Sequence, residues 1–78
     1  MKPQKKYLVM VHLHPEGDER TSIERDAGEC NMYGFAYELI RAYRAPPGEC
    51  VDGFTILNRK TGHRAPVKRG MDAEADNV

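Results

Sequence analysis

The side chains best suited to hold a metal ion are two histidines that alternate along one apolar segment. His12 and His14 are two residues apart, so in an extended strand both project from the same side. Such a pair suits zinc, and Cys30, Cys50 and His63 supply further ligand types. However, the chain contains neither Cys-x-x-Cys nor His-x-x-x-His, and these further ligands are far apart in the sequence. We therefore predict no metal and no cofactor, and we expect the two histidines to border an apolar patch.

The cysteines could also act as nucleophiles. Cys50 and His63 would form a Cys–His pair, but such a site also needs an orienting group and an oxyanion hole. The sequence identifies neither an orienting group nor an oxyanion hole, so we predict that the protein is not an enzyme. Lys2 to Leu13 is basic and then apolar, but Pro15 follows where a signal peptide has small residues for cleavage. A cytoplasmic protein with reduced thiols is therefore expected.

Basic side chains gather in one short segment after residue 58. They are Arg59, Lys60, Arg64, Lys68 and Arg69. A two-stranded basic ribbon can enter a major groove or follow a phosphate backbone, although aromatic residues for stacking are missing here. A nucleic-acid-binding module is therefore the alternative function, and a solvated edge strand protected from aggregation is the structural interpretation.

The overall charge balance gives no support to a general affinity for nucleic acid. The chain has 12 basic and 12 acidic residues, a formal net charge of zero. The charges are nevertheless unevenly placed, because residues 16–30 contain six acids against two arginines, for −4. No apolar run approaches the roughly 20 residues of a membrane span, so no membrane association is predicted.

A helix is predicted between Asn31 and Gly48. A continuous apolar stripe recurs there with helical spacing and comprises Met32, Phe35, Ala36, Leu39, Ile40 and Tyr43. The side chain of Asn31 could cap the first turn, and Pro46-Pro47-Gly48 cannot continue the helix. Gly34 within this segment costs about 1 kcal/mol relative to alanine.

Four strands are predicted around this helix, at Tyr7–Leu13, Arg20–Asp26, Val51–Asn58 and His63–Lys68. The first and third are the most apolar and should be central, whereas the second and fourth are polar and should lie at the edges. A right-handed crossover through the helix then gives an antiparallel sheet in the order 2-1-3-4. The prediction is a ββαββ, α+β fold with one domain over residues 1–69 and a disordered acidic tail over 70–78.

One helix cannot cover both faces of this sheet. We expect it to cover the face with Tyr7, Val9, Val11, Phe54 and Ile56. The second face would then carry an uncovered apolar patch made of Leu8, Met10, Val51 and Leu57. Small monomers rarely leave such a patch in water, so another molecule or a second copy is expected to cover it.

The leading hypothesis is a small non-enzymatic domain that binds another protein or a second copy of itself. Two surfaces are candidates. The open sheet face comprises Leu8, Met10 and Leu57, with His12 and His14 at its border. The helix surface comprises Tyr37, Arg41 and Arg44, residue types that are enriched among interface anchors. Compact chains of this kind are often regulators or inhibitors carried by phages and other mobile elements, and by analogy we expect such a role here.

Overall fold

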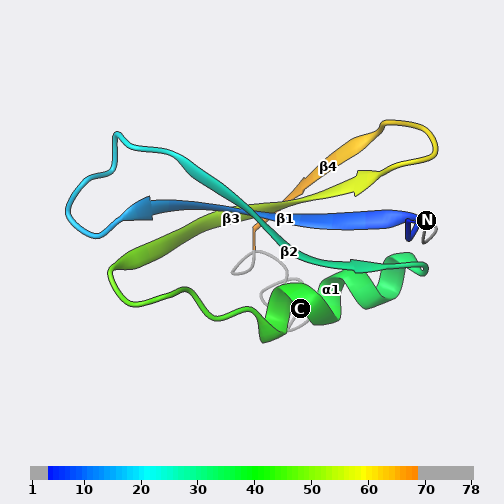
Figure 1. The fold of residues 1–78 in the computed structure, drawn as a ribbon, viewed down its shortest axis with the longest axis horizontal. Coiled ribbons are helices and arrows are strands. Elements are labelled where there is room, and N and C mark those ends of the chain that lie inside the picture. The colour runs from blue at the N-terminus through cyan, green and yellow to red at the C-terminus, as the bar shows by residue number, and fades with distance from the viewer. Residues whose placement is uncertain (1–3, 69–78) are drawn as a thin grey trace, which may run out of the picture.

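Four strands form one antiparallel sheet in the order β2-β1-β3-β4, and one helix lies on one face of it (Figure 1). The computed structural model describes residues 4–68. The elements are β1 (Tyr7–Pro15), β2 (Ile23–Cys30), α1 (Tyr33–Ala42), β3 (Glu49–Asn58) and β4 (Arg64–Val67). The predicted fold class, strand order and antiparallel pairing are confirmed. The tail predicted for 70–78 lies outside the described residues.

The core lies between the helix and the two central strands. Val9, Val11 and Leu13 of β1 are fully buried, and Phe54 and Ile56 of β3 are 1% exposed. Each of these strands alternates apolar side chains toward the helix, which is the period-2 pattern that predicted them. The helix contributes Ala36 and Ile40 to the same cluster.

A β-bulge in β3 changes the predicted face of one residue. The register runs from His12 opposite Gly53 to Leu13 opposite Val51, so Asp52 is the additional residue on β3. On the N-terminal side of the bulge, at Glu49–Val51, each side chain of β3 lies on the opposite face from the one it would have in a regular strand. Val51 therefore packs against the core beside Leu13, and its predicted place on the second face is wrong.

β2 lies at Ile23–Cys30 and not at the predicted Arg20–Asp26, and it contains a second bulge. Val9 lies opposite Gly28 and Met10 lies opposite Asp26, so Ala27 is the additional residue. The strand continues to Cys30, through a segment that was predicted to be a connection. Gly28 has φ +151°, and a Cβ there would lie 3.0 Å from Cδ2 of Leu39. Glycine is needed at this position because the helix approaches the strand closely.

The helix begins one residue later than predicted. Its N-cap is Met32, with no side-chain hydrogen bond to the first turn. Asn31 does not cap the helix, because its Oδ1 accepts a hydrogen bond from the backbone N–H of Lys6, at 3.1 Å. At the other end Tyr43 is extended, with ψ 135°, and its N–H donates to the carbonyls of Leu39 and Ile40. The helix has therefore already ended when the chain reaches the two prolines.

The predicted buried stripe of the helix is only partly buried. Ala36 and Ile40 are buried, but Met32 is 62% exposed and Phe35 is 56% exposed, so their expected burial is wrong. The physical reason is the position of α1, which lies over β2 and β1 at one side of the sheet (Figure 1). The flank with Met32 and Phe35 extends past the outer edge of β2, where no strand lies beneath it in residues 4–68.

Candidate functional site

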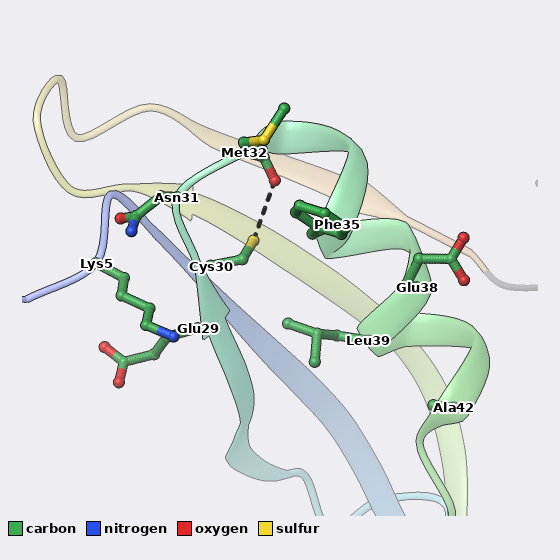
Figure 2. Close-up of a pocket in the computed structure, with 9 residues that line it drawn as sticks. All are labelled: Lys5, Glu29, Cys30, Asn31, Met32, Phe35, Glu38, Leu39 and Ala42. Atoms are coloured by element: carbon green, nitrogen blue, oxygen red, sulfur yellow. Dashed lines mark hydrogen bonds between the residues drawn. The ribbon is translucent and has the colours of Figure 1, made fainter.

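A groove of about 620 Å³ lies between the outer edge of β2 and one flank of α1 (Figure 2). Its apolar lining comprises Cys30, Met32, Phe35, Leu39 and Ala42. Its polar rim comprises Lys5, Glu29, Asn31 and Glu38. Met32, Phe35, Leu39 and Ala42 recur with helical spacing, and this set is called the groove flank of α1 below. Figure 2 shows Phe35 and Leu39 pointing from the helix toward the strand.

The groove flank contains the most exposed large apolar side chains of residues 4–68. Met32 is 62% exposed and Phe35 is 56% exposed, and Tyr33 beside them is 42% exposed. A water-exposed methionine at the N-cap and a water-exposed phenylalanine in the first turn of one helix are typical of a protein-binding surface. This site was missed in the sequence because the same helical spacing was interpreted as a core-facing stripe.

Cys30 forms the floor of the groove and connects β2 to the start of α1. Its side chain is 7% exposed, and its Sγ–H donates to the carbonyl oxygen of Met32, at 3.2 Å. Leu39 is half-buried and contacts the position of Gly28. Both sides of the groove are therefore held by the core, and only the outer part of the flank is open to solvent.

The outer edge of β2 forms the other wall, and its side chains away from the helix are acidic. Glu24, Asp26 and Glu29 lie opposite His12, Met10 and Leu8 in the register, so they share the face that the helix does not cover. Glu29 bonds to the guanidinium of Arg59, and Glu24 Oε2 lies 3.4 Å from Nδ1 of His12. Asp26 makes no ion pair within residues 4–68.

The register places Leu8, Met10 and Leu57 together on the face away from the helix, as expected, but the expected exposure of Met10 is wrong. Leu8 lies opposite Leu57, and Met10 lies opposite Thr55. Leu8 and Leu57 are half-buried, and Met10 is only 8% exposed, so this patch offers less apolar surface than the groove flank.

The two histidines at the border of this face have hydrogen-bond partners. His12 Nε2 lies 2.7 Å from the Thr55 hydroxyl, and His14 Nδ1 lies 2.7 Å from a carboxylate oxygen of Asp52. Within residues 4–68, no three of the potential ligands among His, Cys, Asp and Glu come together in a way that could hold a metal ion.

The predicted helix surface is divided between packing and capping. Tyr37 is half-buried and packs edge-to-face on Tyr33, with ring centroids 5.6 Å apart. A hydrogen bond with Tyr37 and partial burial raise the pKa of Tyr33. Arg41 bonds to Glu38 at 3.3 Å, and Arg44 donates to the carbonyl of Arg41 at 3.2 Å, which satisfies an acceptor at the helix C-terminus.

The predicted basic segment forms the hairpin between β3 and β4, with Gly62 at φ +80° in its turn. Arg59 is already engaged, since its guanidinium bonds to Glu29 and to the carbonyl of Lys5, the latter at 3.1 Å. Lys60, Arg64 and Lys68 are exposed, and Arg69 lies outside the described residues. Of the four described basic side chains of this segment, three therefore remain exposed to solvent, and Arg59 is the one bonded to other parts of the fold.

Cys50 and His63 are not brought together. Cys50 lies near the start of β3, whereas the carbonyl of His63 accepts a hydrogen bond from the N–H of Asn58 at the other end of the strand. The histidine across from Cys50 is His14 of β1. The topology therefore places Cys50 and His63 at opposite ends of β3.

None of the helical structure in residues 4–68 is long and apolar enough to cross a membrane. In comparisons with known proteins, no protein-family model, no curated protein and no solved structure matches this chain.

Proposed function

We propose that this chain is a small, non-enzymatic protein-interaction domain that binds a partner protein at the groove flank of α1. The observation that supports this most directly is the exposure of Met32 and Phe35, at 62% and 56%, beside a groove of about 620 Å³. The flank is held in place by the core through Leu39 and Cys30, so little conformational freedom is lost when a partner binds.

The apolar surface available here is large enough to matter for affinity. Full burial of a methionine or phenylalanine side chain contributes about 1.5–3 kcal/mol. The exposed portions of Met32 and Phe35 together would contribute on the order of 3 kcal/mol, or roughly a hundredfold in the dissociation constant. A chain of this size would act by occupying a surface of its partner, which is the action of a regulator or an inhibitor.

The test compares three variants of the full chain. Phe35→Glu places a charge in the groove, Leu8→Glu places one on the open sheet face, and Thr61→Glu places one in the exposed β3–β4 turn. A partner captured from the native host by the unmodified chain is purified, and its dissociation constant is measured for each variant. Far-UV circular dichroism and thermal unfolding establish that each variant is folded.

We expect Phe35→Glu to weaken binding at least tenfold, while Leu8→Glu and Thr61→Glu bind as the unmodified chain does. Loss of binding in Leu8→Glu with full binding in Phe35→Glu would instead identify the open sheet face. Binding of DNA or RNA that weakens steeply with salt and is lost on replacing Lys60 and Arg64 by alanine would support the nucleic-acid alternative.

A further inference from the structure

We propose that the partner segment binds as an additional β-strand on the outer edge of β2, beneath the groove flank of α1. The segment would be extended and would alternate large apolar residues with lysine or arginine. This inference rests on the proposed function and specifies how the partner is recognised. Addition of a strand to a free sheet edge uses main-chain hydrogen bonds for affinity and alternate side chains for specificity.

The first reason is that one flank of α1 extends past the outer edge of β2, which is the edge of the sheet. Met32, Phe35, Leu39 and Ala42 line the groove together with Glu29, Cys30 and Asn31 from β2 and the following turn. The side chain of Glu29 belongs to the opposite face, since it lies opposite Leu8. The groove therefore passes around the edge of β2, at the place that a fifth strand would occupy.

The second reason is that the dimensions match. The helix has 10 residues, and at about 1.5 Å per residue it is about 15 Å long. A strand rises about 3.3 Å per residue, so about four or five residues of an added strand would lie beneath the helix. Two or three of their side chains would point toward the groove flank, which has Met32, Phe35 and Leu39 to receive them.

The third reason is the negative charge of the β2 edge. This charge favours a segment of a partner protein over a second copy of this chain as the added strand. Glu24, Asp26 and Glu29 all project on the face away from the helix. If two copies of β2 paired with each other, acidic side chains would lie opposite or diagonal to acidic side chains, and this is destabilising. A strand with lysine or arginine on this face would form opposite-charge cross-strand pairs instead. Asp26, which makes no ion pair within residues 4–68, is the closest to being free for such a pair.

The experiment uses the full chain labelled with ¹⁵N and three sets of acetylated octapeptides. The first set alternates lysine with valine, leucine or phenylalanine, and the second set has glutamate in place of lysine. The third set repeats the first with N-methyl groups on alternate residues, which removes the donors needed for pairing at one edge. Amide shifts, hydrogen exchange and dissociation constants are measured for each peptide. Light scattering reports the oligomeric state without peptide.

We expect at least one lysine peptide to bind, to shift the amides of residues 23–30 and to slow exchange at edge-facing amides of β2 at least tenfold. Its glutamate and N-methyl counterparts should bind at least tenfold more weakly. Asp26→Lys should weaken the lysine peptide and strengthen the glutamate peptide. Glu19→Lys, the same charge change in the exposed turn between β1 and β2, should alter neither.

Three outcomes would overturn the strand-addition inference. The first is an N-methyl peptide that binds as tightly as its parent with shifts confined to α1, which would leave the groove as a protein-binding site. The second is that no lysine peptide binds. This result would not bear on the proposed function, which is tested by the effect of Phe35→Glu on binding of the captured partner. The third is a dimer in which the edge of β2 is protected without peptide, which would identify a second copy as the occupant.

Discussion

At the scale of single residues, the two cysteines differ in access although both follow the same Gly-Glu dipeptide. Cys30 is 7% exposed and donates to the carbonyl of Met32, whereas Cys50 is half-buried at the start of β3. A thiol reacts through its thiolate and only where a reagent can reach it. The difference in reactivity is thus set by the fold and not by the local sequence.

We expect iodoacetamide to alkylate Cys50 at least ten times faster than Cys30 in the folded chain. Cys30 lines the groove but is only 7% exposed, so we expect attack on its Sγ to require a local opening of the start of α1 away from β2. Peptide mass spectrometry of a time course measures both rates in one sample. In urea the two rates should become similar, and equal rates in the folded chain would contradict the burial of Cys30.

Some side-chain roles could be predicted from residue type and spacing, and others could not. The alternation of His12 and His14 placed both on the uncovered face, as the structure confirms. Their partners Thr55 and Asp52 could not be predicted, because the cross-strand register depends on a bulge 40 residues later in the chain. The same holds for Arg59, which was a candidate nucleic-acid ligand under the alternative function and is bonded to Glu29.

At the scale of elements, the glycine of β2 and the glycine of α1 have opposite structural roles. Gly28 has φ +151° and lies beneath Leu39, so a side chain there meets both an unfavourable backbone conformation and the helix. Gly34 lies within α1, and no heavy atom comes within 4 Å of the place that its Cβ would take. The close approach between helix and strand is therefore found at Gly28 and not at Gly34.

Gly34→Ala should raise the free energy of unfolding by about 1 kcal/mol, because alanine has the higher helix propensity. Gly28→Ala should lower it by about 1–3 kcal/mol through overpacking and backbone strain. The two variants carry the same chemical change and serve as controls for each other. Urea titrations give both values, and equal effects would contradict the packing of Leu39 on β2.

The strand order was predictable because composition separates central from edge strands and the right-handed crossover then places β2 beside β1. The apolar segments around Val9 and Ile56 became β1 and β3, and the polar segments became β2 and β4. The two bulges were not predictable, since Ala27 and Asp52 have no side-chain property that marks them. The exposure of Met32 and Phe35 could not be predicted either. Periodicity shows which side of a helix is apolar, but it does not show how far the sheet extends beneath that side.

At the scale of the whole molecule, two ion pairs join the edge strand β2 to the β3 region across the central β1. Arg25 bonds to Glu49, with the second contact, Nη2 to Oε2, at 2.9 Å, and Glu29 bonds to Arg59. Arg25 lies opposite Val11 and Glu29 lies opposite Leu8, so the two pairs begin on opposite faces of the sheet. They restrain the sheet edge that forms one wall of the groove.

The stability of the molecule should therefore fall in acid in a way that depends on Glu49. The hydrogen bond from Arg25 holds the pKa of Glu49 below its ordinary value of 4.5. The carboxylate is thus more acidic in the folded than in the unfolded chain. Its contribution to stability is present above the ordinary pKa and is lost as the pH falls through the lower folded value. Because both side chains are partly exposed, the effect should be modest.

Urea titrations between about pH 6 and about pH 2 measure this dependence. Glu49→Gln should unfold more readily at the upper end and lose less stability in acid than the unmodified chain. Glu19→Gln removes the same charge from an exposed turn and is the matched control. If Glu49→Gln retained the full acid dependence, the pair would not be a stabilising contact of the folded state.

The central position of β1 has a consequence for the order of events during synthesis. This strand is made before the other three, yet one of its two neighbours is β3, so that Tyr7 must meet Asn58. The core cannot close until the ribosome has released both. Pairing between segments so distant along the chain is slow, because closing the long loop between them costs entropy. The apolar strand β1 therefore stays unpaired on its β3 side until β3 has been synthesised. A chaperone would therefore encounter this protein first through Tyr7–Pro15.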